Sequence, residues 1–84
     1  MYEYLIAFRS VTRAQHAIAY LRQFHIVGKL ERIPQGLATD GCGHGVIIRS
    51  VDFYPALSKL KQGQIAYERV FRMDLNFHAE EVVL

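Results

Sequence analysis

The stretch YEYLIAFRSVTRAQHAIAYLRQFHIVG, residues 2–28, joins two hydrophobic patterns of different period and decides the fold class. Its first part, up to Ser10, is a short run of aromatic and aliphatic residues that ends at a polar break, which is typical of a β-strand. The following residues show helical spacing of apolar positions at Ala14, Ala17, Ile18, Leu21 and Phe24 or His25. Ser10 or Thr12 can cap this helix, and Gly28 is expected to end it.

The rest of the chain adds three strand patterns and a second helix pattern. These are strand KLERI (29–33), strand GVIIRS (45–50), helix FYPALSKLKQ (53–62) and strand QIAYERVFRM (64–73). Asp52 or Ser50 can cap the second helix, and Gly63 can end it. The structure of the tail, residues 74–84, is left open by its sequence.

The predicted order is therefore β-α-β-β-α-β, contained in one domain of residues 1–73 with the tail of residues 74–84 after it. This order predicts an α+β, ferredoxin-like fold: a four-stranded antiparallel sheet with both helices on one face. The first and third strands are then antiparallel neighbours. Residues 8–10 at the end of the first strand consequently lie beside residues 43–45 at the start of the third.

Composition narrows the class of protein. With 84 residues the chain has the length of one domain, and its net charge of +2 is too small to indicate a nucleic-acid partner. The N-terminus lacks the pattern of a signal peptide, and no apolar run is long enough to cross a bilayer, so we expect no membrane partner and a cytoplasmic location. A single cysteine excludes an internal disulfide and a zinc site built from several thiolates.

That cysteine lies in TDGCGHG, residues 39–45, between the second and third predicted strands. Gly41 and Gly43 flank Cys42; they would leave its sulfur open and let backbone N–H groups turn toward an anion. An open thiolate is what attack on a persulfide and release to an acceptor require. The ordinary alternative for a free cysteine is a small buried side chain without a chemical task.

Several groups are expected to lower the pKa of the Cys42 thiol. The predicted topology brings it to the N-terminal end of the first helix, where the helix dipole is positive. Arg9 and Arg13 lie near that end, and His44 follows two residues after the thiol, on the same face of an extended chain. Asp40 acts in the opposite direction, because a neighbouring carboxylate disfavours the thiolate.

Several short motifs occur in a fixed order over about residues 2–73. They are YLIAFRS, AQHAIAYLRQFHI, KLERIP, the pair Cys42–Gly43, VIIR at residues 46–49 and QIAYERVFRM. In this order they resemble a small bacterial family of selenium/sulfur carrier-like proteins. The chain departs from the family pattern at residues 39–41, where serines are usual, and at residues 44–45, which are additions. The resemblance implies a thiol-based carrier role for Cys42.

We therefore predict a carrier of sulfur or selenium whose atom acceptor is Cys42. The supporting residues are Gly41, Gly43, His44, Arg9 and Arg13. No cofactor, no metal and no turnover of a small-molecule substrate are expected. The partners would be a sulfur or selenium donor protein and an acceptor protein.

A second hypothesis is a non-catalytic, ferredoxin-like binding module that self-associates. Its basis is the tail, because apolar residues beyond the last strand could pair with the edge strand of a second copy. These residues are Phe77, Val82, Val83 and Leu84.

Two further classes are weaker. A metal site could use Cys42 and His44 with one of His16, His25 and His78, but no two histidines have the spacing of one helix face. An RNA-recognition domain has the same element order, but Val46 and Ile48 stand where that class carries stacking aromatic residues.

Overall fold

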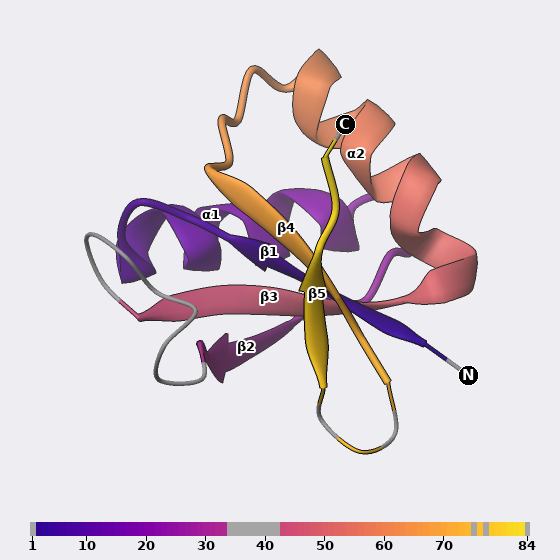
Figure 1. Cartoon of the computed structure of the whole chain (residues 1–84). Coiled ribbons are helices and arrows are strands. Elements are labelled where there is room, and N and C mark those ends of the chain that lie inside the picture. The colour runs from indigo at the N-terminus through magenta and orange to yellow at the C-terminus, as the bar shows by residue number, and fades with distance from the viewer. Residues whose placement is uncertain (1, 34–42, 75, 77, 84) are drawn as a thin grey trace.

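The computed structural model describes residues 2–33, 43–74, 76 and 78–83. Within them the chain forms two α-helices and a five-stranded antiparallel sheet, so the α+β class is confirmed (Figure 1). The elements are β1 (Glu3–Ala7), α1 (Val11–Arg22), β2 (Lys29–Arg32), β3 (His44–Arg49), the short 3₁₀ helix η1 (Ser50–Asp52), α2 (Phe53–Gln62), β4 (Arg69–Met73) and β5 (Ala79–Glu81). Neither of these helices is long and apolar enough to cross a membrane.

The strand order in the sheet is β2-β3-β1-β4-β5, and each pair of neighbours is antiparallel. β1 pairs with β3 from Glu3 opposite Arg49 to Ala7 opposite Gly45. The prediction that the first and third strands are antiparallel neighbours is therefore confirmed. The prediction of four strands is wrong, because β5 pairs with β4 along one edge of the sheet.

β5 comes from the tail whose structure the sequence left open. The Asp74 carboxylate accepts hydrogen bonds from the backbone N–H groups of Asn76 and His78, at 2.9 and 3.0 Å, and so shapes the turn that leads into β5. Ion pairs then join the two strands: Arg69 with Glu81 at 2.5 Å and Arg72 with Glu80 at 3.2 Å.

One of the tail residues proposed above for self-association, Val82, instead makes contacts within its own chain. The backbone N–H of Val82 donates to the carbonyl of Val70 at 2.8 Å, and the Val82 side chain packs against the core. Val83 is exposed, whereas Phe77 and Leu84 lie outside the described residues. Val82 is therefore an internal contact of this fold.

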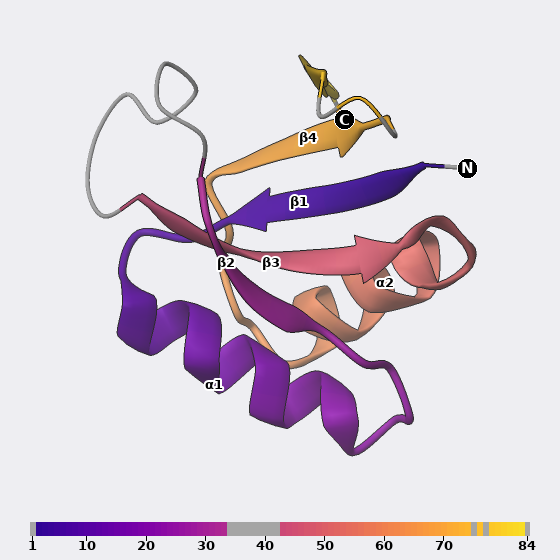
Figure 2. The same cartoon turned by 90° about the horizontal axis from the view of Figure 1, so that it is seen from below.

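Both helices cover the same face of the sheet (Figure 2). Buried residues of α1 and α2 meet alternate residues of the strands there, and Tyr4 of β1 stacks on Phe53 of α2 with ring centroids 3.8 Å apart. A second, smaller cluster lies on the opposite face: Leu5, Ala7, Ile33, Phe71 and Met73. The strands thus carry buried side chains on both faces.

α1 begins where the sequence predicts and ends earlier. Ser10 is its N-cap, and its side chain accepts a hydrogen bond from the Arg13 N–H at 3.1 Å. At the other end the N–H of Ile26 donates a hydrogen bond to the carbonyl of Leu21, and the residue before Ile26, His25, has φ 62°. This pattern closes a helix with a left-handed residue, the position that glycine usually takes.

Gly28 was expected to end α1, and this prediction is wrong. The helix is already closed at His25, and Gly28 instead lets the chain pass the core. A Cβ on Gly28 would lie 2.5 Å from Cγ1 of Val46, closer than two non-bonded carbon atoms can approach. Glycine is needed here for lack of space.

α2 has the predicted bounds, Phe53–Gln62, and Asp52 is its N-cap residue, as predicted. The Asp52 side chain makes no capping hydrogen bond, however; its carboxylate pairs with Arg49, the last residue of β3, at 3.0 Å. The end of α2 at Gly63 agrees with the prediction, and the left-handed residue that follows is Gln64, with φ 56°.

The predicted fourth strand, residues 64–73, is a strand only from Arg69. Ile65 and Tyr67 do alternate with exposed neighbours and pack against the core. The Glu68 N–H donates to the carbonyl of Ala7, where β1 ends, and within the described ranges no strand pairs with the residues before Glu68. The alternation therefore reports which side chains face the core and not strand pairing.

Candidate functional site

The start of β3 lies beside the end of β1 and close to the beginning of α1, as the sequence predicts. Ala7 and Gly45 are register partners, and a Cβ on Gly45 would lie 2.6 Å from the carbonyl oxygen of Ile6. Gly43 is held from the other side, because its carbonyl accepts the Ile33 N–H at 2.5 Å. Residues 43–45 are thus fixed against both β1 and the end of β2.

His44 is the first residue of β3 and shares a face with Val46 and Ile48, which belong to the helix-covered core. Its side chain is half-buried, and its Nδ1 atom is buried with no hydrogen-bond partner in the described part of the chain. Buried polar atoms are nearly always paired. The Nδ1 of His44 is therefore a buried polar atom without a hydrogen-bond partner among the described residues, and it lies within the glycine-rich segment, residues 39–45.

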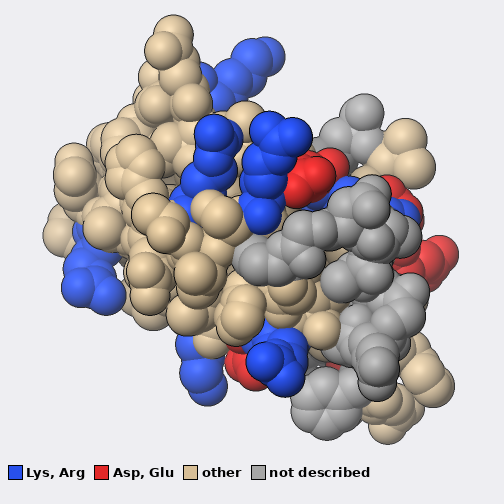
Figure 3. Space-filling model, turned by 90° about the vertical axis from the view of Figure 1, so that its left-hand side faces the viewer, with Lys and Arg blue, Asp and Glu red and all other residues tan. Residues whose placement is uncertain are grey.

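Arg9 and Arg13 line a hollow of about 250 Å³ together with Ala66, Tyr67 and Glu68. Neither arginine side chain makes an ion pair with any residue that the structure describes. Figure 3 looks onto this side of the molecule and shows Lys and Arg side chains spread over it, two of them side by side next to an acidic side chain. Two guanidinium groups that have no ion-pair partner among the described residues make this hollow a place where an anion would be stabilised.

Cys42 and Gly41 lie outside the described residues, so their assigned roles stay predictions. Gly43 does belong to the described part, and among the described residues a Cβ there would meet only the carbonyl oxygen of Ile33, at 4.0 Å. Gly43 and Gly45 therefore differ in kind, since only Gly45 is required by close packing.

The histidines proposed for a metal site are spread over the molecule. His16 lies in α1, His25 follows α1, and His78 lies in the turn between β4 and β5. Among the described residues, no three His, Cys, Asp or Glu side chains are grouped so as to hold a metal ion. A set that includes Cys42 falls outside this comparison.

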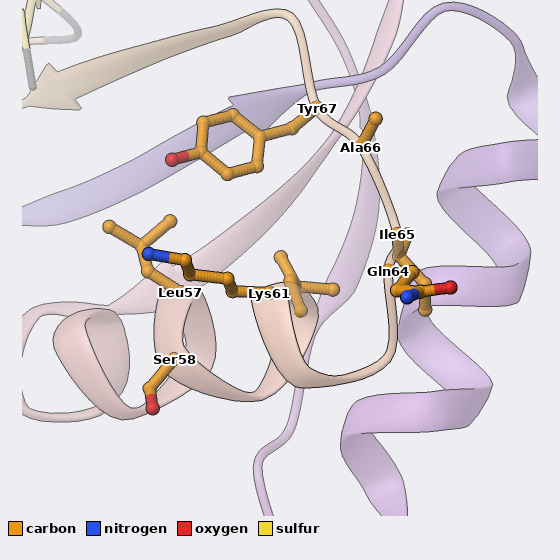
Figure 4. A pocket seen from close by; sticks show the side chains of 8 residues that line it. Leu57, Ser58, Lys61, Gln64, Ile65, Ala66 and Tyr67 are labelled. Atoms are coloured by element: carbon orange, nitrogen blue, oxygen red, sulfur yellow. The ribbon is translucent and has the colours of Figure 1, made fainter.

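A larger hollow, of about 710 Å³, was not predicted from the sequence. It lies between the second half of α2 and residues 64–67 (Figure 4). Its lining residues are Leu57, Ser58, Leu60, Lys61, Gln64, Ile65, Ala66 and Tyr67. The signal was present in the alternation of Ile65 and Tyr67, which we interpreted as a strand.

Comparisons of the chain with protein-family models, with curated proteins and with solved structures find no match. The candidate site is therefore interpreted from its own residues.

Proposed function

We propose that this chain is a thiol-based carrier of sulfur or selenium and that Cys42 accepts the transferred atom. The observation that carries the proposal is the pairing of Ala7 with Gly45. It holds the segment directly after Cys42 beside the start of α1, at the end of the sheet where Arg9 and Arg13 lie unpaired with respect to the described residues.

The transfer step is a thiol exchange at sulfur. The Cys42 thiolate attacks the terminal sulfur of a donor persulfide, R–S–S–H, and a new S–S bond forms as the donor's S–S bond breaks. The donor leaves as the thiolate R–S⁻, and Cys42 keeps the terminal sulfur with its proton as Cys–S–S–H. The donor persulfide is reduced to a thiol while Cys42 is oxidised to a persulfide, so electrons balance. A donor with terminal selenium would react in the same way.

The neighbouring residues have separate roles in this proposal. Gly41 and Gly43 leave the thiol accessible, and the lack of close contacts between Gly43 and the other described residues supports this role. Arg9 and Arg13 favour the anionic form of the thiol and of the bound persulfide. His44 tunes the charge at the site, supported by its buried and unpaired Nδ1.

We also assign residues 2–73 to the ferredoxin-like class, with β5 as an added edge strand. The β-α-β-β-α-β order and the neighbouring β2, β3, β1 and β4 support this assignment. A cytoplasmic location is part of the proposal, because a single free thiol persists in a reducing compartment.

The test is to incubate the reduced protein with a cysteine desulfurase and cysteine, or with a selenium donor, and to measure its intact mass. We expect a gain of one sulfur or selenium atom that a reducing agent removes and that the Cys42→Ser variant does not show. The rate of alkylation of Cys42 against pH should give a thiol pKa below the ordinary value of about 8.5.

Gly43→Ala is the matched variant, because the structure leaves room for the added methyl group. It should keep the fold and react more slowly. A thiol that titrates near its ordinary pKa, together with no adduct from any donor, would contradict the carrier function.

A further inference from the structure

The larger hollow, between α2 and residues 64–67, has an apolar floor and polar groups at its rim. Leu60 is buried, and Leu57, Ile65 and Tyr67 are half-buried against the core. Its volume of about 710 Å³ falls in the range of about 300–1,000 Å³ that small-molecule sites occupy. Its size and apolar floor therefore suit the apolar body of a small ligand.

The rim carries hydrogen-bonding capacity that the described part of the protein does not use. The Lys61 ammonium makes no ion pair with a described residue, and the Tyr67 hydroxyl makes no hydrogen bond with one. In Figure 4 the Lys61 nitrogen and the Tyr67 oxygen point toward the same end of the hollow, beside Leu57. A positive charge and a hydroxyl over an apolar floor are complementary to an anionic group on an apolar body.

From this geometry we propose that the hollow binds a small organic anion with an apolar body, such as an aryl or alkyl carboxylate. The apolar body lies on Leu57, Ile65 and Tyr67, and the carboxylate accepts hydrogen bonds from the Lys61 ammonium and the Tyr67 hydroxyl. None of the residues that line this site belongs to residues 39–45, although Ala66 and Tyr67 also line the hollow beside Arg9 and Arg13.

Gln64 supports this assignment. It lines the hollow and holds a left-handed backbone, φ 56°, at a helix end where glycine is the less strained residue. A side chain kept at a strained position is a common property of functional sites. We infer that the Gln64 amide contributes to the rim at the end of the hollow opposite the Lys61 nitrogen and the Tyr67 oxygen (Figure 4). His25, with φ 62° after α1 and outside the hollow, is a matched control for the backbone effect.

The test uses 4-phenylbutanoate as the probe and 4-phenylbutan-1-ol as its uncharged analogue, each titrated into the full-length protein and followed by backbone-amide NMR. We expect the carboxylate to shift amides within residues 57–67 and to bind about two- to fivefold more tightly than the alcohol. Lys61→Gln should remove most of this preference for the carboxylate. Lys59→Gln should not, because the Lys59 ammonium lies over the Phe24 ring, 4.5 Å from its centroid, and outside the hollow.

Gln64→Gly and His25→Gly separate binding from stability. Both should make the protein more stable, but only Gln64→Gly should weaken binding of the carboxylate. The proposal is overturned if residues 57–67 do not respond up to about 10 mM probe, a very weak affinity. Equal binding of the alcohol would also overturn it, as would amide shifts at residues 57–67 that depend on protein concentration alone, since a second copy would then cover the hollow.

Discussion

Gly45 of β3 and Ile6 of β1 approach so closely that a Cβ on Gly45 would lie 2.6 Å from the Ile6 carbonyl oxygen and 2.9 Å from Cδ1 of Leu5. The nearest atom belongs to the backbone and cannot turn aside as a side chain can. The two central strands therefore need glycine at this register position. Gly43, two residues earlier, has no such neighbour among the residues that the structure describes.

We predict that Gly45→Ala lowers the free energy of unfolding by about 1–3 kcal/mol, because the added methyl group forces β3 away from β1. Gly43→Ala should change it by less than about 0.5 kcal/mol. Urea unfolding followed by circular dichroism measures both. Equal stability of the two variants would contradict this distinction.

The two left-handed residues give the opposite prediction. His25 and Gln64 hold φ 62° and φ 56°, which glycine adopts without steric cost. His25→Gly and Gln64→Gly should each raise the free energy of unfolding by about 0.5–1 kcal/mol, less than the full steric relief because glycine also gives the unfolded chain more freedom. Thermal unfolding of both single variants and of the double variant tests this, since their effects should add. A loss of stability in both would show that these side chains make contacts that outweigh the strain.

The stability of the β4–β5 connection should depend on pH. The pKa of Asp74 lies below its ordinary value because the backbone N–H groups of His78 and Asn76 donate to the carboxylate. The pKa of Glu81 is lowered by its hydrogen bond and ion pair with Arg69. For both groups the folded pKa is below the unfolded one, so their contribution is complete above the ordinary values of 3.8 and 4.5 and is lost as pH falls through the folded pKa.

We therefore expect the amide chemical shifts of Ala79–Glu81 to move toward disordered values at acid pH before those of β1 do. Asp74→Asn keeps an oxygen that can accept the turn hydrogen bonds but carries no charge, so it should reduce this pH dependence. If the amide chemical shifts of β5 and β1 change together at every pH, the whole protein unfolds at once, which would contradict a separate loss of β5.

The arginines at the start of α1 give a prediction about the thiol. Arg9→Gln and Arg13→Gln should each raise the pKa of Cys42, because each removes a positive charge that favours the thiolate. The pH dependence of alkylation measures this, and the effect should shrink at high salt, as it does for exposed charges. Arg22→Gln, in the last turn of α1, is the control with the same change in net charge. An equal shift for Arg22→Gln would remove the specific role of the two arginines.

The sequence predicts the central part of this fold because its patterns are long and regular. Ala14, Ala17 and Leu21 have helical spacing and are all fully buried in α1. The β-α-β-β-α-β order then leaves few arrangements of the strands, and the predicted pairing of the first and third strands is the one observed. The end of β1 and the start of β3 were therefore placed together correctly.

Other features depend on tertiary contacts that carry no local pattern. β5 is three residues long, Ala-Glu-Glu, and too short to show an alternation of apolar and polar residues. Its ion pairs are with Arg69 and Arg72 of β4, which the local sequence does not predict. A glycine after a helix pattern can either end the helix or allow close packing, and the sequence does not distinguish the two. Gly28 allows close packing against Val46. The hollow beside α2 is lined by Ile65 and Tyr67, which follow the end of α2 and pair with no strand in the described part of the chain.

β5 has a consequence for how the protein behaves at high concentration. A sheet that ended at β4 would offer a row of unpaired backbone groups next to Phe71, a template for adding a strand from another molecule. β5 occupies that row, and its outer edge is short and carries Glu80 and Glu81. The other edge, β2, carries Lys29, Glu31 and Arg32. Both borders of the sheet thus resist edge-to-edge aggregation, and the last strand of the chain provides half of that protection.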